Sequence, residues 1–252
     1  KKGRQIYNSV SKTKGNTNMK VVILAGGFGT RLSEYTESIP KPMVPIGDLP
    51  MIHHIINIYS KYGHREFYIA LGYKGDVIKK YFNHKINDLN INLIDTGSET
   101  LTGGRVKRLE KYLNKEKFLL TYGDGLSNIN INDLISFHEN HKKIVTMSAV
   151  RPPARFGALT LEDNKIMKFK EKVQLNDNWI NGGFFVMDPK FFRYLKNDQT
   201  ILEKEPIENA VKDDEIRAFR HEGFWQCMDH KVDKDYLDKL VKEKKAPWLI
   251  EE

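Results

Sequence analysis

Residues 21–42 restrict the fold of this chain more than any other segment of the sequence. An apolar run at 21–24 (VVIL) is followed at once by the glycine-rich turn 25–31 (AGGFGTR). An abrupt change of this kind is typical of a buried parallel strand that leads into a helix. The glycines leave the backbone of the turn uncovered, so that consecutive N–H groups can converge on the oxygens of a phosphate. The segment therefore predicts an anion-binding loop at the end of a central strand.

Two cations accompany this loop. Arg31 closes the turn with a fork-shaped guanidinium, and Lys41 follows ten residues later between two prolines. A glycine-rich turn by itself also fits a tight connection that binds nothing, because short motifs often match by chance. The two cations at these positions favour a site for a triphosphate.

The length and the cysteine content narrow the class of protein. A chain of 252 residues suits one large α/β domain with a substantial hydrophobic core. It contains no apolar run of membrane-spanning length and no signal-peptide core near its start. The single cysteine, Cys227, excludes an intramolecular disulfide and fits a reducing compartment. We therefore expect a cytoplasmic protein that does not bind membranes.

The net charge of +8 is unevenly distributed. Residues 1–18 contain five lysines and arginines and no acidic residue, and they show no hydrophobic periodicity. We interpret them as a disordered leader or tag, followed by a single domain over residues 19–252. A basic arm for nucleic acid is the alternative. The rest of the chain is only mildly basic, which suits phosphorylated small molecules and predicts no nucleic-acid partner.

The order of the elements indicates the fold. In the first half, strands predicted at 21–24, 67–71, 91–94 and 118–122 alternate with helices predicted at 51–62, 76–82, 104–113 and 132–140. This alternation predicts an α/β fold with a doubly wound, mostly parallel sheet. The turns at 25–31 and 123–125 both follow strands, so they should face one crevice at the carboxyl ends of the strands.

The second half of the chain has a different pattern. Strands are predicted at 145–150, 157–161, 165–169 and 179–187, and a charged helix is predicted at 233–244. This meander predicts antiparallel strands that extend the sheet and form a pocket of the size of a sugar.

Two aspartates are candidate metal ligands. Asp124 directly follows a strand and lies between two glycines, where a carboxylate can hold Mg²⁺ together with phosphate oxygens. An Asx turn is the alternative for this residue. Asp229 is the candidate for a second ligand, although taken alone it fits a cap of the following helix better.

Other polar residues are candidates for binding a sugar or a nucleotide. Glu171 and Lys172 follow one predicted strand and Asn181 opens the next, so they fit sugar hydroxyls and a phosphate. A solvated charge pair is the alternative for the first two. Thr100 and Arg105 lie in a hydroxyl- and glycine-rich turn before a helix, which fits a nucleotide or a plain cap.

Several motifs together resemble a known family. They are LAGGFGTRL with KPMVPIG, GYKGDVIKKYF, DTGSETLTGGR, TYGDG, RFGAL, INGGFF and GFWQCMD. They resemble the sugar-1-phosphate nucleotidyltransferases, from residue 19 almost to the end of the chain. The combination of DTG, TGGR, RFGAL and GFWQ is most similar to the glucose-1-phosphate cytidylyltransferase branch. The resemblance implies a Rossmann-like nucleotide-diphospho-sugar transferase fold with a small antiparallel sugar-binding part.

The resemblance also implies a reaction. With the help of Mg²⁺, CTP and α-D-glucose 1-phosphate would give CDP-glucose and pyrophosphate. The product would serve surface polysaccharide synthesis, and the enzyme would form a homo-oligomer. Carried over by position, Arg31 would meet the departing pyrophosphate and Lys41 the α-phosphate. Asp124 and Asp229 match the metal ligands. The sugar-phosphate side matches Glu171, Lys172 and Asn181, and the nucleotide side matches Leu24, Ala25, Gly26, Gly27, Gly29, Thr30, Thr100, Arg105 and Gly123.

Two departures from the family pattern leave alternatives open. The segment 83–93 is shorter than its counterparts, and Val173 stands where relatives commonly have proline, which presets the backbone. The alternatives are another nucleotide, another phosphorylated acceptor, or a regulatory subunit without catalytic activity. A regulatory subunit without catalytic activity would be expected to have lost Arg31, Lys41 or one of the two aspartates, and this chain retains them all.

Overall fold

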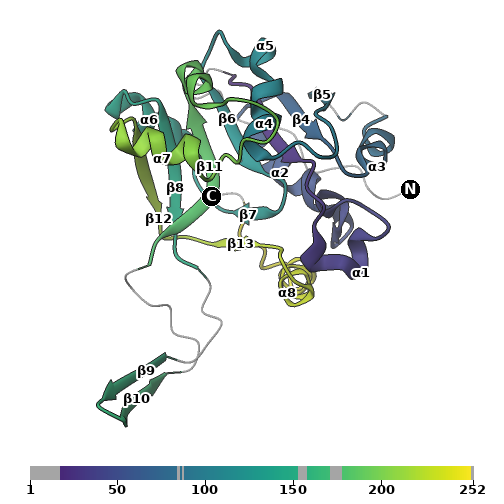
Figure 1. The fold of residues 1–252 in the computed structure, drawn as a ribbon. Coiled ribbons are helices and arrows are strands. Elements are labelled where there is room, and N and C mark those ends of the chain that lie inside the picture. The colour runs from purple at the N-terminus through teal and green to yellow at the C-terminus, as the bar shows by residue number, and fades with distance from the viewer. Residues whose placement is uncertain (1–17, 84–85, 87, 153–157, 171–177, 251–252) are drawn as a thin grey trace.

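The computed structural model describes residues 18–83, 86, 88–152, 158–170 and 178–250. Glu171, Lys172 and residues 1–17 lie outside the described part of the chain. The largest sheet has seven strands (Figure 1). In spatial order they are β12 (Ile216–His221), β8 (Val145–Val150), β11 (Ile180–Met187), β6 (Phe118–Tyr122), β1 (Val21–Ala25), β4 (Glu66–Leu71) and β5 (Asn90–Asp95).

Strand β1 lies at the centre of this sheet, paired in parallel with β4 on one side and with β6 on the other. Of the seven strands, only β11 runs against its neighbours. The chain passes from β1 to β4 and β5, and then returns to β6 on the opposite side of β1. Such a reversal opens a crevice at the carboxyl ends of the strands, where ligands bind in doubly wound sheets. The predicted mixed, mostly parallel sheet is confirmed.

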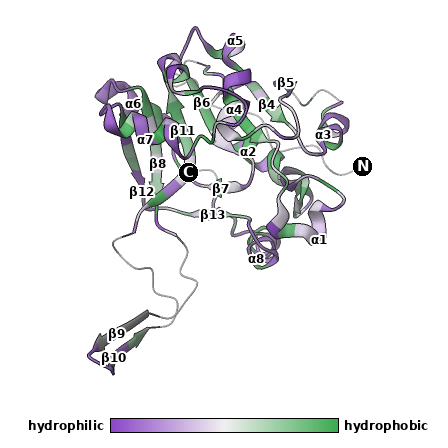
Figure 2. Cartoon of the chain, in the orientation of Figure 1, coloured by the Kyte–Doolittle hydropathy of each residue, from purple (hydrophilic) through white to green (hydrophobic). Residues whose placement is uncertain are grey.

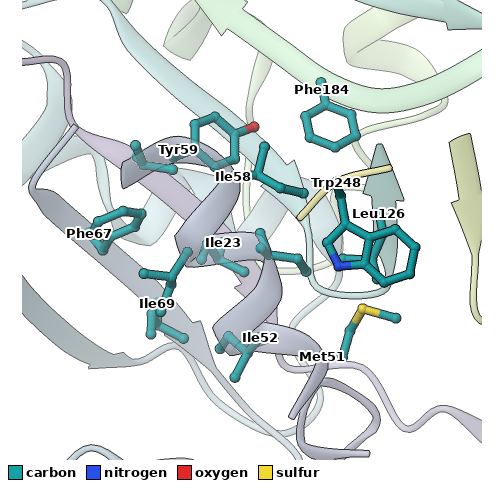
Figure 3. Close-up of a cluster of buried hydrophobic side chains, with 14 of the residues drawn as sticks. Ile23, Met51, Ile52, Ile58, Tyr59, Phe67, Ile69, Leu126, Phe184 and Trp248 are labelled. Atoms are coloured by element: carbon teal, nitrogen blue, oxygen red, sulfur yellow. The ribbon is translucent and has the colours of Figure 1, made fainter. Parts of the chain in front are cut away.

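The sheet is buried on both faces, because successive side chains of a strand point to opposite sides. In β1, Val21 and Ile23 belong to one core cluster, and Val22 and Leu24 belong to the other. Figure 3 shows the first cluster, in which Ile23 lies near helix α2 (Met51–Lys61). In Figure 2 the hydrophobic colour follows the strands of the sheet. This double burial explains why the strands of the first half are continuous apolar runs.

Helices cover both faces of the sheet. Buried residues of α2 and α8 (Lys231–Lys242) belong to the first cluster. Those of α4 (Thr102–Arg108) and α5 (Glu110–Leu113) belong to the second. The remaining helices are α1 (Ser33–Thr36), α3 (Gly75–Tyr81), α6 (Ile131–His141) and α7 (Glu205–Lys212), with 3₁₀ turns at η1 (Thr30–Leu32), η2 (Lys41–Met43) and η3 (Pro189–Tyr194). No helix of the described residues is long and apolar enough to cross a membrane.

Two sequence-based expectations about these elements are wrong. The single helix expected at 104–113 is two helices, separated at the fully buried Leu109, whose N–H bonds to the Val106 carbonyl one residue short of helical spacing. The meander does not join the large sheet as a whole. Strands β9 (Ala158–Glu162) and β10 (Lys165–Lys170) pair only with each other among the described strands, and Figure 1 shows this hairpin away from the sheet.

Two buried histidines give the fold a predicted sensitivity to acid. His64 Nδ1 accepts a bond from the Met19 N–H, and His138 Nδ1 pairs with Thr146 Oγ1. Among the described residues, their Nε2 atoms are buried without a partner. Burial lowers the pKa of each imidazole to about 4, from an ordinary value of 6.5. The neutral form is therefore favoured in the folded state, and its stabilising effect is complete above pH 6.5 and decreases as the pH falls toward 4.

We therefore expect the free energy of unfolding to be lower at pH 5 than at pH 7.5, by about 2 kcal/mol for each histidine. Urea unfolding followed by circular dichroism at the two pH values measures this difference. The variant His138→Gln, which cannot titrate, should lose less stability between the two values than the parent protein. An equal loss in both proteins would contradict the assignment to His138.

Candidate active site

The glycine-rich loop lies at the carboxyl end of β1, as the sequence predicts, but its glycines differ in what surrounds them. A Cβ on Gly27 would meet nothing within 4 Å, so this position is open to a ligand. Gly29 adopts φ of 65°, a left-handed conformation that favours glycine. A Cβ on Gly26 would lie 2.3 Å from the guanidinium carbon of Arg105, so a protein side chain occupies the space beside this glycine. Of the three, only Gly27 has a side-chain position that opens to solvent.

The two cations and the two aspartates form one cluster beside this loop. Lys41 Nζ lies 2.7 Å from Asp124 Oδ2 and 2.7 Å from Asp229 Oδ1, so it bridges the two carboxylates. Arg31 Nη1 donates to Asp229 Oδ2 at 2.9 Å. The Lys41 side chain is 12% exposed, whereas that of Arg31 is 67% exposed. Lys41 is thus held in place between the carboxylates, while Arg31 lies at the solvent side.

A small two-stranded ladder brings the aspartates together although 105 positions separate them in sequence. Strand β7 (Gly125–Ser127) pairs antiparallel with β13 (Trp225–Cys227), with Cys227 opposite Gly125. Asp124 precedes β7 and Asp229 follows β13, so the antiparallel pairing places both residues at the same end of the ladder. The Met228 N–H donates to the Asp124 carbonyl at 2.8 Å and continues the ladder between them.

Charges within the cluster shift the pKa values of two members. Burial alone lowers the pKa of Lys41, but the carboxylates of Asp124 and Asp229 outweigh it and raise this pKa above 10.5. Burial alone raises the pKa of Asp229, but Lys41 and Arg31 outweigh it and hold this pKa below 3.8. All of these shifts favour the charged forms. Lys41 and Asp229 are therefore both charged at neutral pH.

A pocket of about 200 Å³ adjoins this cluster. Residues of β6, β7, β11 and β13 line it together with the charged cluster: Arg31, Thr121, Tyr122, Asp124, Gly125, Asn181, Gly182, Gly183, Phe184, Trp225, Cys227 and Asp229. The structure thus brings the predicted residue Asn181 to the same cavity as the two aspartates and Arg31.

Tyr122 and Trp225 line the pocket but were not singled out from the sequence, and Cys227 was noted there only as the single cysteine. Tyr122 Oη accepts a bond from Asn181 Nδ2 at 3.0 Å and donates to Glu203 Oε1 at 2.7 Å. The Trp225 indole donates to the Gly182 carbonyl at 2.7 Å. Burial and the neighbouring carboxylates raise the pKa of the Cys227 thiol to about 12, so it stays protonated and unreactive. The position of Tyr122, two residues before Asp124, is a signal that could have indicated its presence in the site.

The structure gives the other candidate residues different surroundings. Arg105 is 4% exposed and donates to protein oxygens rather than toward solvent. Thr100 is buried, and Gly123 packs so closely that a Cβ would lie 2.7 Å from the Leu24 carbonyl oxygen. Glu171 and Lys172 lie outside the described residues. Direct contacts of these residues with a ligand stay predictions.

A comparison with known protein families shows which family this chain belongs to. A profile of the nucleotidyl transferases matches residues 20–226. The chain belongs to the nucleotidyl transferase family. The loop, the two cations and the two aspartates all lie within or directly beyond the part of the chain that matches the family.

Relatives with known names resemble the chain over most of its length. It is 44% identical over 253 residues to the glucose-1-phosphate cytidylyltransferase of Salmonella typhi, covering 91% of this chain and 98% of that protein. It is 42% identical to the probable glucose-1-phosphate cytidylyltransferase of Bacillus subtilis, covering 92% of this chain and all of the relative. The fold is similar to that of a putative glucose-1-phosphate thymidylyltransferase from Bacillus anthracis, with a TM-score of 0.73 over 89% of this chain and 96% of that one, at 20% identity.

The donor set of the cluster fits a hard divalent cation. Asp124 and Asp229 present carboxylate oxygens to the same lysine nitrogen, and within the described residues no group of three or more metal-binding side chains occurs. Mg²⁺ characteristically uses one or two carboxylates and completes its shell with water and substrate phosphates. Two aspartates beside the glycine-rich loop therefore fit such an ion, and they fit zinc poorly, because zinc prefers four nitrogen or sulfur ligands.

Proposed function

We propose that this nucleotidyltransferase condenses CTP with α-D-glucose 1-phosphate to give CDP-glucose and pyrophosphate. The observation that carries the proposal is the cluster in which Lys41 bridges Asp124 and Asp229 beside the open Gly27 backbone and the sugar-sized pocket. The choice of substrates rests on the relatives, whose names state that activity at 42% and 44% identity over nearly their whole length. The site uses residues from 26 to 229, which supports one nucleotidyltransferase domain over residues 19–252.

The chemistry requires little covalent help from the protein. An oxygen of the sugar phosphate forms a bond to the α-phosphorus of CTP while the bond from that phosphorus to the bridging oxygen breaks, and pyrophosphate leaves with the electron pair. The sugar phosphate is already ionised near neutral pH, so no general base is needed. What the protein must supply is in-line alignment and positive charge where negative charge develops.

The charged cluster would supply this positive charge. Lys41, whose side chain is 12% exposed, would meet the α-phosphate, and Arg31, whose side chain is 67% exposed, would follow the departing pyrophosphate. Mg²⁺ held by Asp124 and Asp229 would act as a Lewis acid and as a template for the phosphates. The free N–H groups of the glycine-rich loop would hold the remaining phosphate oxygens.

The pocket beside the cluster is the proposed site of the sugar. Asn181 is fixed by its bonds to Tyr122 Oη and to the Gly183 N–H, so its amide is preorganised for a hydroxyl. We assign Glu171 and Lys172 to the same side on the family resemblance alone. The role in surface polysaccharide synthesis and the assembly into a homo-oligomer have the same basis.

A crossed substrate assay tests the proposal. The protein is incubated with CTP, dTTP, UTP or GTP and with glucose 1-phosphate or mannose 1-phosphate, and pyrophosphate release is measured. We expect kcat/KM for CTP with glucose 1-phosphate to exceed that of every other pair by about tenfold or more. Faster turnover with dTTP or UTP would contradict the choice of nucleotide. No turnover with any pair would favour a regulatory subunit that binds nucleotide sugars.

A further inference from the structure

The carbonyl of Gly26, in the glycine-rich loop, accepts two hydrogen bonds from distant parts of the chain. The Tyr73 N–H donates to it at 3.1 Å, and Arg105 Nη2 donates to it at 2.9 Å. A carbonyl oxygen has two lone pairs, so both are used. The orientation of the peptide between Gly26 and Gly27 is therefore set from outside the loop.

Arg105 is fully committed to this arrangement. Its Nη1 atom donates to the Leu71 carbonyl at 3.1 Å, to Thr96 Oγ1 at 2.7 Å and to the Gly97 carbonyl at 2.7 Å. Its Nη2 atom donates to the carbonyls of Gly26 and Ser98, the latter at 3.1 Å. The four protons on these two nitrogens thus meet five protein oxygens. A direct bond from either nitrogen to a ligand would require one of these contacts to be given up.

Two glycines make room for this guanidinium. A Cβ on Gly26 would lie 2.3 Å from Arg105 Nη1, and a Cβ on Gly72 would lie 2.4 Å from the same atom. Both distances are far below van der Waals contact, so neither position accepts a side chain while Arg105 keeps its place. Gly72 is not among the described glycines that have a positive φ. A side chain at position 72 is therefore excluded by lack of space and not by the backbone conformation.

The planar trans peptide transmits this constraint to the ligand side. In such a peptide the carbonyl of one residue and the N–H of the next point in opposite directions. Because Arg105 and Tyr73 hold the Gly26 carbonyl inward, the Gly27 N–H points away from them. Among the residues that the structure describes, the N–H groups of Gly27, Phe28 and Gly29 have no protein acceptor. Consecutive free N–H groups in a loop form an anion-binding nest.

We propose that Arg105 is a positioning residue that clamps the Gly26 carbonyl and thereby aims the Gly27 N–H at the phosphates of the nucleotide. The proposal rests on the proposed function for the identity of the ligand, but its chemistry requires only a polyphosphate. It assigns Arg105 an action through the backbone of the loop. It also gives Gly72, which lies in a different loop from the glycine-rich turn, a part in phosphate binding.

The test compares three variants of the full chain. Arg105→Met removes the donors, and Gly72→Ala keeps every donor but displaces the guanidinium. Arg108→Met is the matched control, because Arg108 lies on the same helix and pairs with Asp198 at 2.6 Å outside the clamp. The backbone ¹⁵N order parameter of the Gly27 amide is measured by NMR without nucleotide, and the Kd for inorganic triphosphate is measured by calorimetry. Neither measurement depends on the reaction that the protein catalyses.

We expect the order parameter of the Gly27 amide to fall from about 0.85 to below about 0.6 in Arg105→Met and Gly72→Ala. The Kd for triphosphate should rise by about tenfold or more in both variants, with Arg108→Met unchanged. Where turnover is measurable, the KM for CTP should rise while the KM for glucose 1-phosphate stays constant, a split that general destabilisation would not produce. Arg105→Lys should recover part of the triphosphate affinity. An unchanged order parameter of the Gly27 amide in both test variants would overturn the proposal. An unchanged order parameter with a raised Kd only in Arg105→Met would point instead to a direct contact with phosphate. If Arg105→Met does not fold, Gly72→Ala alone decides.

Discussion

Replacing Asp124 with asparagine should reduce turnover by roughly 100-fold or more while the fold survives. Asp124 is bound to Lys41 at 2.7 Å, and its side chain is 31% exposed, so it faces both the cluster and the solvent. Asparagine has nearly the same shape but carries no charge and is a weaker ligand for a hard cation. The backbone carbonyl of residue 124, which accepts the Met228 N–H, is kept. Initial rates of pyrophosphate release at saturating substrates and increasing Mg²⁺ measure the effect.

The matched control is Asp76→Asn. The Asp76 side chain is 92% exposed on helix α3 and pairs only with Lys79 among the described ion pairs. This variant should retain the parental rate, and thermal unfolding should give similar midpoints for both variants and the parent. A near-parental rate for Asp124→Asn at saturating Mg²⁺ would contradict the assignment of Asp124 as a metal ligand.

The central strands could be predicted from the sequence because burial on both faces makes each of them a continuous apolar run. Strand β6 has the predicted bounds, and β1 and β4 differ from prediction by one residue. The edge strand β12 was not predicted. It carries Arg217, Arg220 and His221 and is only partly buried, so its composition resembles that of a loop. Apolar patterns thus reveal the centre of this sheet and its edge strand β5, but not the edge strand β12.

The loop and its cations could also be predicted, since their residues are close in sequence. The approach of Asp229 to Asp124 could not be predicted from spacing. It depends on β7 and β13, strands of three residues each, which are too short for any periodicity. Only the family resemblance pointed to Asp229.

The partners of Arg105 lay beyond sequence reasoning for a different reason. An arginine in a glycine-rich turn fits a phosphate contact and a backbone clamp equally well. The choice depends on carbonyls from three separate segments: Gly26 in the glycine-rich loop, Leu71 at the end of β4, and positions 97–98. These segments meet only in the folded protein. For the same reason, the sequence suggested that Gly26 lies beside the ligand. In the structure, the Arg105 guanidinium occupies the space beside Gly26.

Replacing Lys41 with methionine should reduce turnover by roughly 100- to 1,000-fold, because it removes the positive charge proposed to face the α-phosphate. It also leaves the carboxylates of Asp124 and Asp229 with Arg31 as the nearest remaining cation in the described cluster. Their mutual repulsion should lower the thermal midpoint, which is measured beside the rate of pyrophosphate release.

Lys41→Arg separates the effect of charge from that of shape. Arginine keeps the charge and can still reach two carboxylates, but its planar fork is wider than an ammonium group. The thermal midpoint should therefore be largely restored, whereas turnover should recover only in part, since the charge no longer lies at the same point. Lys79→Met, on the exposed face of α3, is the control and should leave both quantities unchanged. Full activity in Lys41→Met would mean that the bridge between the aspartates only stabilises the fold, and that Arg31 carries the charge compensation.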